Sequence, residues 1–414
     1  METPAAPARD RLLRSFRHRN FRLFFAGQFV SLTGTWMQSV AVSWLVYRLT
    51  GSSMALGLVG FASHIPVFLF GLFGGCLADR GNKRAILIAA QAAAMLQALT
   101  LAALTLSGTA NVWLVVSLAT FLGLVNAVDM PTRQAFVVDM VGREDLHNAI
   151  ALNSSMFNSA RVVGPAMAGV LVAVIGEGWC FLVNGLSYLA VIAALAAMRL
   201  PPSQPRSNTG SVLSHVRQGV AYAWGEGSIR SILGCLIVTS LFASFYMVLL
   251  PVVVTTVLGQ GAQGLGFLMA ATGIGSVASA LLLALRQKGR GLSRWRVISG
   301  LGVGLVMVAF AFSQTFWLSL CLSTLLGFCL IFFFAASNTM LQQQSPDAMR
   351  GRIMALYSVT LVGMAPFGSL LAGTTASLVD APTAIALAGG LCAAGVALFA
   401  SLDRRSSNPN QTCP

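Results

Sequence analysis

Long apolar runs separated by short polar segments follow one another along the whole chain. A helix needs about 20 apolar residues to cross the hydrocarbon core of a bilayer, and twelve runs come close to that length. A membrane β-barrel would instead show segments of about ten residues with alternating polarity. The pattern therefore predicts an all-α membrane protein with twelve transmembrane helices. The runs cover residues 24–47, 54–78, 85–107, 112–128, 152–175, 179–197, 229–258, 265–285, 295–312, 316–336, 354–378 and 383–400.

The composition supports a chain embedded in lipid. Hydrophobic residues make up 56% and charged residues 9% of the sequence, whereas soluble domains carry about 25% charged residues. A chain so poor in charge cannot cover a water-facing surface, which excludes a soluble enzyme. The formal net charge of +14 does not indicate nucleic-acid binding, because the basic residues lie between the apolar runs without interleaved aromatic side chains.

Arginine and lysine gather in alternate gaps. Of the 26 basic residues, Arg48 lies in the other set of gaps and Arg161 inside a run, which leaves 24 on one side of the membrane. Basic loops are retained in the cytoplasm. We therefore expect both termini to be cytoplasmic. We also expect a multi-pass protein of a bacterial inner membrane that is a monomer in the lipid bilayer.

The longest gap, residues 201–228, divides the runs into two sets of six. It predicts three parts: an N-terminal tail and six-helix bundle (1–200), a cytoplasmic central loop (201–228), and a C-terminal six-helix bundle and tail (229–414). Parallel six-helix repeats are a transporter architecture, in which one half rocks against the other. The sequence supports a repeat, because Ala151, Leu152, Gly164 and Gly169 recur 204 residues later as Ala355, Leu356, Gly368 and Gly373.

Polar side chains at helical spacing mark candidate substrate contacts. In the first run Gln28, Thr35 and Gln38 share one face with Ser31, and Trp36 lies beside Thr35 inside the span, away from the interfacial belt where tryptophan gathers. Ser244 holds a similar place in the seventh run. The alternative for all of them is helix packing, because polar side chains also bond neighbouring helices.

Arg161 is the one basic residue in the middle of a run. A guanidinium there is penalised by about 3 kcal/mol on insertion scales, so it should face a wet cavity or a partner. Asn158 shares its helix face. In one interpretation Arg161 is a fixed positive charge that attracts anionic substrate groups; in the other it is held by helix carbonyls or by Asp129 and braces the bundle.

Two titratable residues are candidates for proton coupling, because ionisable groups inside a membrane are costly and usually functional. They are His64 in the second run and Asp129 near the cytoplasmic end of the fourth. For His64 the alternative is a neutral ring that bonds within the helix kink made by Pro66.

Two motifs carry a resemblance to a known family. Residues 75–84 read GCLADRGNKR, which resembles the major facilitator superfamily signature G-x-L-A-D-R-x-G-R-R/K, with Asn82 in place of the second glycine. Residues 131–136 (PTRQAF) and 161–165 (RVVGP) resemble the drug and siderophore exporter branch, which includes macrolide efflux proteins and the enterobactin exporter.

The resemblance implies alternating access, with spans 1, 4, 7 and 10 lining the path. It also implies a cytoplasmic latch formed by Asp79, Arg80, Lys83 and Arg84. Asp79 would meet the start of span 11 near Ile353 and Met354, and Lys83 or Arg84 would meet Asp129. The alternative is a solvated loop that obeys only the positive-inside rule. A Gly-Pro motif in span 5, here Gly164-Pro165, is associated in the superfamily with exchangers and exporters.

The sequence thus predicts a secondary active exporter of small amphipathic molecules, drug-like compounds or a siderophore, driven by proton antiport. An uptake symporter or a lipid translocator of the same fold, or a non-transporting membrane sensor, are the alternatives. No enzyme is expected, because paired acids or a nucleophile with its base are missing. We expect no cofactor, no metal site and no nucleic-acid partner.

Overall fold

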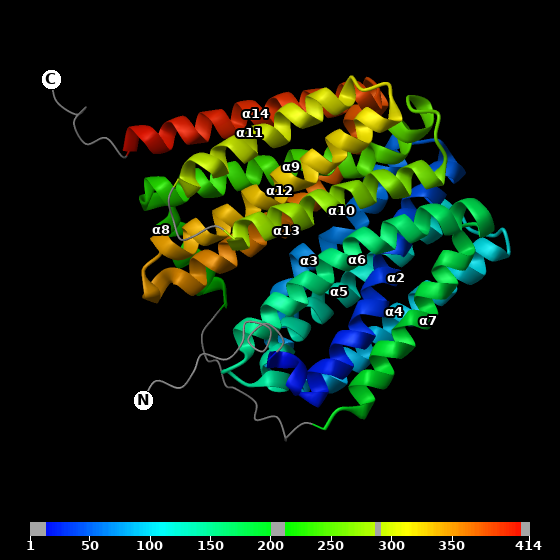
Figure 1. Cartoon of the computed structure of the whole chain (residues 1–414), viewed down its shortest axis with the longest axis horizontal. Coiled ribbons are helices and arrows are strands. Elements are labelled where there is room, and N and C mark those ends of the chain that lie inside the picture. The colour runs from blue at the N-terminus through cyan, green and yellow to red at the C-terminus, as the bar shows by residue number, and fades with distance from the viewer. Residues whose placement is uncertain (1–13, 200–211, 286–290, 407–414) are drawn as a thin grey trace.

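The computed structural model describes residues 14–199, 212–285 and 291–406, and these residues form one short 3-10 helix and thirteen α-helices (Figure 1). The 3-10 helix is η1 (Arg14–Arg17). The α-helices are α2 (Arg19–Thr50), α3 (Ser53–Arg80), α4 (Lys83–Leu106), α5 (Val112–Val141), α6 (Leu146–Ile175), α7 (Glu177–Ala197), α8 (Val212–Gly225), α9 (Gly227–Thr256), α10 (Ala262–Leu285), α11 (Leu292–Ala311), α12 (Phe316–Gln344), α13 (Asp347–Leu378) and α14 (Ala381–Ser406).

Local sequence signals set several helix ends. Ser52, Asn82 and Asn111 are N-cap residues, whose side-chain oxygens accept hydrogen bonds from the backbone N–H three residues later. Asn82, the departure from the family signature, therefore starts α4. Gly51 ends α2 with a φ of 60°, a left-handed conformation that glycine adopts without steric cost.

Eleven helices among the described residues are long and apolar enough to cross a membrane. They correspond to eleven of the twelve predicted spans. The other predicted span, 24–47, lies in α2, which has 32 residues but carries several polar side chains as well as Arg19, Arg22 and Arg48. Length and apolar composition alone therefore do not mark α2 as a span.

The helices extend beyond the predicted runs mainly at one end of the molecule. The fourth run was predicted to end at 128, but α5 continues to Val141, and α6, α12 and α13 are also longer at that end. An apolar run ends where the hydrocarbon ends, whereas a helix continues into water as long as its residues favour it. The predicted central loop contains the helix α8, and its residues 201–211 lie outside the described residues.

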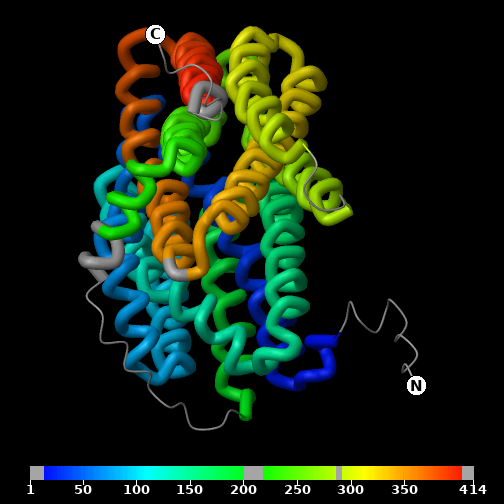
Figure 2. Tube along the Cα trace, turned by 90° about the vertical axis from the view of Figure 1, so that its left-hand side faces the viewer, coloured from blue at the N-terminus to red at the C-terminus, as the bar shows by residue number. Residues whose placement is uncertain are grey.

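The helices form two groups, the N-terminal group (α2–α7) and the C-terminal group (α9–α14), which lie side by side in Figures 1 and 2. In the first group α2 packs on α6 and α7, α3 on α5, and α4 on α5 and α7. Each of these pairings recurs seven helices later, as α9 with α13 and α14, α10 with α12, and α11 with α12 and α14. The two groups thus share one packing pattern.

The groups meet where α3 packs on α13 and α6 on α10. We call the end of the molecule where α2 begins the terminal face, and the other end the opposite face. Glycines make the closest approach, near the opposite face. A Cβ on Gly57 would lie 2.8 Å from the Cα of Gly373, and one on Gly169 would lie 3.0 Å from the Cα of Gly266. Toward the terminal face the ribbons of the two groups diverge (Figure 1).

Candidate transport site

Arg161 and Trp36 face each other midway along α6 and α2. The guanidinium carbon of Arg161 lies 5.6 Å from the centroid of the Trp36 ring, which is the geometry of a cation–π contact. Both side chains are partly accessible. The predicted candidates from two different spans are therefore neighbours in space.

No carboxylate neutralises Arg161 within the described part of the chain. Acids on the same or neighbouring helices have other cationic partners: Asp129 pairs with Arg133, Asp145 with Arg14 and Glu177 with Arg48. The predicted structural role of Arg161 through Asp129 is therefore not supported. The guanidinium keeps its donors for another group, and five N–H donors in a planar fork suit a carboxylate or a similar oxyanion.

A second aromatic ring completes this cluster. Phe157, one helical turn before Arg161, contacts Trp36 edge to face with 5.8 Å between ring centroids, and it is 40% exposed. Asn158 is partly accessible and donates a hydrogen bond of 2.9 Å to the carbonyl of Ser154 in its own helix. Sequence reasoning missed Phe157. The signal was its i, i+4 spacing to Arg161, which puts both on one face of α6.

Gly164 brings the two helices close enough for this contact. A Cβ at Gly164 would lie 2.6 Å from both the Thr33 carbonyl oxygen and the Trp36 Cβ, so any larger residue would push α6 away from α2. The carbonyl of the following Pro165 lies against Gly266 of α10. The Gly-Pro pair therefore lies where α6 packs between α2 and α10.

The polar stripe of the first span faces mainly into its own bundle. Gln38 is 4% exposed, donates to Gln97 of α4 over 3.0 Å and accepts from Asn184 of α7 over 2.7 Å. Gln28 is 2% exposed. Thr35 donates to the Ser31 carbonyl of α2 itself. The predicted substrate contacts of Gln28 and Gln38 are thus placed in buried packing positions, which was the stated alternative.

Ser244 lies at the packing contact between α9 and α13. Its hydroxyl donates to the Ser240 carbonyl, and a Cβ on Gly368 would lie 2.8 Å from its oxygen. The side chain is partly accessible. This position is the counterpart in the C-terminal group of the α2–α6 contact at Gly164.

Asp129 is buried in α5, where it is 4% exposed. It accepts a hydrogen bond of 2.8 Å from Gln91 of α4 and pairs with Arg133 at 3.4 Å, one turn along its own helix. The expected partners Lys83 and Arg84 are elsewhere. Lys83 pairs with Asp139 at 2.7 Å, and Arg84 donates to the Ala196 carbonyl over 2.6 Å. The predicted pairing with Asp129 is therefore wrong, because α5 continues three more turns and presents Asp139 at the surface instead.

The predicted latch contact of Asp79 is absent in this conformation. Asp79 and Arg80 are exposed near the terminal face, and Asp79 makes no hydrogen bond or ion pair within the described segments. α3 contacts α13 at Gly57, Gly60 and Phe68. With a rise of about 1.5 Å per residue, Asp79 lies over 30 Å along the helix from Gly57, at the end where the two groups diverge.

His64 is exposed on α3, and its Nδ1 lies 2.8 Å from the carbonyl oxygen of Gly60. The ring is thus bonded to its own helix one turn before, and Pro66 follows two residues later in the same helix.

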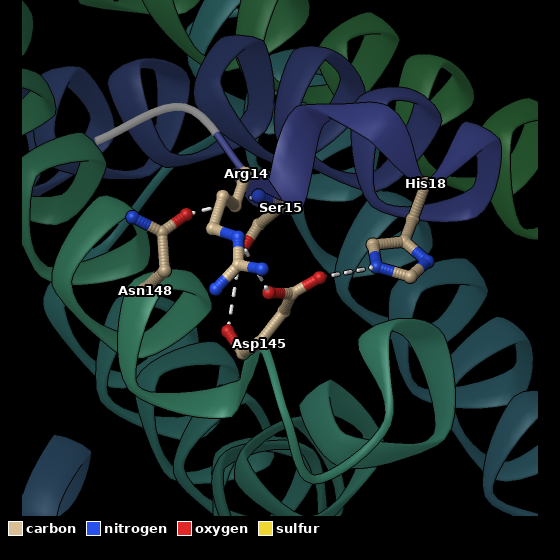
Figure 3. A network of polar contacts seen from close by, with 5 residues as sticks. All are labelled: Arg14, Ser15, His18, Asp145 and Asn148. Carbon is tan, nitrogen blue, oxygen red and sulfur yellow. Dashed lines mark hydrogen bonds and ion pairs between the residues drawn. The ribbon is translucent and has the colours of Figure 1, made fainter. Parts of the chain in front are cut away.

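At the terminal face, η1 is held against the start of α6 by the polar network of Figure 3. Asp145 pairs with His18 at 2.9 Å and with Arg14 at 3.8 Å, and its carbonyl accepts from the Ser15 hydroxyl. The backbone N–H of Ser15 donates to Asn148. These contacts fix the segment that precedes α2.

Comparison with known proteins decides the family. The family model described as transmembrane secretion effector matches residues 12–412. The chain belongs to this family, within the major facilitator superfamily. This match agrees with the family that the sequence motifs at residues 75–84 and 161–165 resemble.

Relatives of this chain include named transporters. The chain is 26% identical over 352 residues to a staphyloferrin A transporter of Staphylococcus aureus (84% of this chain, 88% of the relative). It is 24% identical to the multidrug efflux pump Tap of Mycolicibacterium fortuitum (84% and 88%) and 27% identical to the enterobactin exporter EntS of Escherichia coli (92% and 91%).

Solved structures of low sequence identity share the fold. The nucleoside transporter NupG superposes with a TM-score of 0.73 at 12% identity, covering 92% of this chain and 99% of that one. A POT family transporter bound to 5-aminolevulinic acid gives a TM-score of 0.75 at 11% identity (94% and 97%). The all-helical fold is therefore that of membrane transporters.

Proposed function

We propose that the protein is a secondary active exporter that moves small amphipathic anions, of the siderophore or acidic-drug class, out of the cell by alternating access. The observation that carries the proposal is Arg161, a mid-span guanidinium that contacts Trp36 and has no carboxylate partner among the described residues. An aromatic, oxygen-rich anion matches both groups, since its ring can stack on Trp36 and Phe157 while its oxygens take the guanidinium. The siderophore and drug transporters among the relatives support the same substrate class.

In this proposal the chain has twelve spans in two parallel repeats, with α2 as the first span, and acts as a monomer in a bacterial inner membrane. The terminal face is cytoplasmic, because the basic loops lie there. The described conformation would then be open to the cytoplasm, with the groups in contact near the periplasm. Arg161 would receive substrate from inside in this state, and the latch at Asp79 would form in the other.

The orientation has a direct test. With the native thiols removed, cysteines at Gly108 and Asp380 should react with an impermeant thiol reagent added to intact cells. A cysteine at Glu144, which is exposed at the other end, should react only after the cells are opened. Labelling of Glu144→Cys in sealed cells would reverse the orientation and with it the direction of transport.

Coupling is proposed to run through Asp129. It is a buried carboxylate with one amide donor and one arginine, and ionisable side chains inside membrane spans commonly serve in proton relays. A proton on Asp129 would release Arg133 from the pair. His64 is the weaker candidate, because its ring is bonded within its own helix.

The function is tested by transport in vesicles made from cells that lack other exporters. A fluorescent catecholate or carboxylate should accumulate in inverted vesicles when a proton gradient is imposed, and an uncoupler should abolish the accumulation. Arg161→Lys keeps the charge but loses the planar fork, and we expect about a tenfold higher apparent KM; Arg161→Ala should lose transport of anions by 100-fold or more.

Arg143→Ala is the matched control, because Arg143 is exposed at the terminal face and should leave the KM unchanged. A folded Arg161→Ala protein that transports the anion with unchanged affinity would make Arg161 structural and remove the basis for an anionic substrate.

A further inference from the structure

A groove of about 730 Å³ runs between α2 and α7 at the terminal face. Its floor is made of small or aliphatic side chains and its mouth of two arginines, Arg19 and Arg22. The lining holds no acidic residue. The remaining lining residues are Leu23, Ala26, Gly27, Val30, Ala190, Ala193, Ala194 and Ala197.

The groove lies on the side of the bundle that faces lipid. α7 packs on α2, α4 and α6, all in the N-terminal group. Val30 on α2 is 49% exposed, and Leu186 and Leu189, one turn beyond Ala190 and Ala193 on the same face of α7, are 52% and 49% exposed. Large apolar side chains in this position are suited to acyl chains rather than to an aqueous path.

The mouth of the groove is a fixed structure. Nη1 of Arg19 donates to the Ala197 carbonyl over 3.2 Å, and Arg84 donates to the Ala196 carbonyl. Asn20 both donates to the Arg199 carbonyl over 2.8 Å and accepts from its N–H over 3.2 Å. The start of α2 is thus bonded to the end of α7, so that the groove is held open without a ligand.

Electrostatics at the mouth favour an anion. Arg22 is exposed and makes no hydrogen bond or ion pair in the described part of the chain, and Arg19 uses one of its five donors on Ala197. The positive end of the α2 dipole lies at the same place, because α2 begins at Arg19. Below the arginines the groove is lined by Ala26, Ala190, Ala193 and Ala194, with Val30 farther along α2.

We propose that this groove binds an anionic phospholipid of the surrounding leaflet, with its phosphate on Arg19 and Arg22 and one acyl chain along the alanines between α2 and α7. Basic pockets between helices at a membrane surface are suited to such head groups. The site is separate from the transport site and lies on the helix that carries Trp36, so an occupied groove would brace α2 against α7.

The test is lipid binding to the purified full-length protein by native mass spectrometry, with phosphatidylglycerol against phosphatidylcholine of the same chains. The double variant R19Q/R22Q should bind phosphatidylglycerol about 30-fold more weakly, which corresponds to about 1 kcal/mol for each arginine. Phosphatidylcholine binding should change by less than threefold.

Two controls keep the result specific. R143Q/R294Q removes the same charge from exposed positions at the terminal face outside the groove, and it should change phosphatidylglycerol binding by less than threefold. Ala193→Trp fills the groove without a change of charge and should weaken binding of both lipids at least fivefold.

Several outcomes would overturn the proposal. Equal losses for R19Q/R22Q and R143Q/R294Q would mean attraction by the overall positive field, and normal binding to Ala193→Trp would place the lipid elsewhere. Displacement of the lipid by millimolar glycerol phosphate would make the site one for free phosphate esters. If R19Q/R22Q fails to fold because the bond to Ala197 is lost, R22Q alone decides, with an expected loss of about fivefold.

Discussion

At the scale of single residues, the balance around Arg161 explains how a charge persists in mid-span. An arginine at the centre of a helix costs about 3 kcal/mol on insertion scales. A cation–π contact at a partly accessible site returns about 1 kcal/mol, and the Trp36 ring supplies one. Partial access of the Arg161 guanidinium to water offsets the rest of the insertion cost. On the proposed function, an anion bound at Arg161 would add to this balance.

Gln38 offers a residue-scale prediction that separates packing from substrate binding. Gln38→Leu removes the partners of Gln97 and Asn184, and an interhelical hydrogen bond in a membrane protein is worth about 0.6 kcal/mol on average. We expect the free energy of unfolding in detergent to fall by about 1 kcal/mol in total, which is seen as a lower midpoint of thermal unfolding. The KM for substrate should stay unchanged.

Gln28→Leu is the matched comparison, because Gln28 is as deeply buried on the same helix but makes no side-chain hydrogen bond to another helix within the described residues. It should destabilise less than Gln38→Leu. A changed KM with normal stability would instead return Gln38 to the substrate path.

At the scale of elements, the ion pair between Lys83 and Asp139 joins the start of α4 to the extension of α5. It is partly shielded, with side-chain exposures of 18% and 34%, so we expect it to contribute up to about 1 kcal/mol. Lys83→Asp and Asp139→Lys should each lower the thermal midpoint, and the double swap should restore most of the loss.

Glu144→Lys serves as the control for that swap, because it reverses an exposed charge nearby and should leave the midpoint unchanged. A double swap no better than the single variants would mean that the two residues contribute independently and that the pair does not hold α4 to α5.

Sequence predicts best those helices whose apolar length is set by the thickness of the hydrocarbon core. Apolar length alone located eleven spans, and the pairing of Trp36 with Arg161 is between two residues that each stood out as polar or aromatic in mid-span. The partner of Lys83 was not predictable, because Asp139 lies in the part of α5 beyond the predicted apolar run, where hydropathy does not indicate whether the helix continues. Gln38 was ambiguous, since a polar stripe looks the same whether it faces a cavity or another helix.

At the scale of the whole molecule, the contact between the two groups is expected to break once in each transport cycle. Phe68 of α3 and Phe367 of α13 lie with ring centroids 5.7 Å apart. In a background free of native cysteines, Phe68→Cys/Phe367→Cys should be joined by a short bifunctional thiol reagent, and the joined protein should lose transport.

Each single-cysteine variant treated with the same reagent is the control and should retain transport. A reducible reagent allows recovery to be measured in the same sample. Full transport by the cross-linked protein would mean that α3 and α13 stay together throughout the cycle, against the proposed rocking of one group on the other.

The glycine contacts between the groups have a kinetic consequence. Where the side chains of two surfaces interdigitate, they must change rotamer before the surfaces separate. Each such change adds to the activation barrier for separation. At Gly57 with Gly373 and at Gly169 with Gly266 the surfaces that meet are backbone, so at these two points no side chain has to change rotamer when the helices move apart. Their approach also leaves no room for a water molecule between them while closed. If one group rocks on the other as proposed, these four glycines would combine a tight seal with a low activation barrier at the points where they meet.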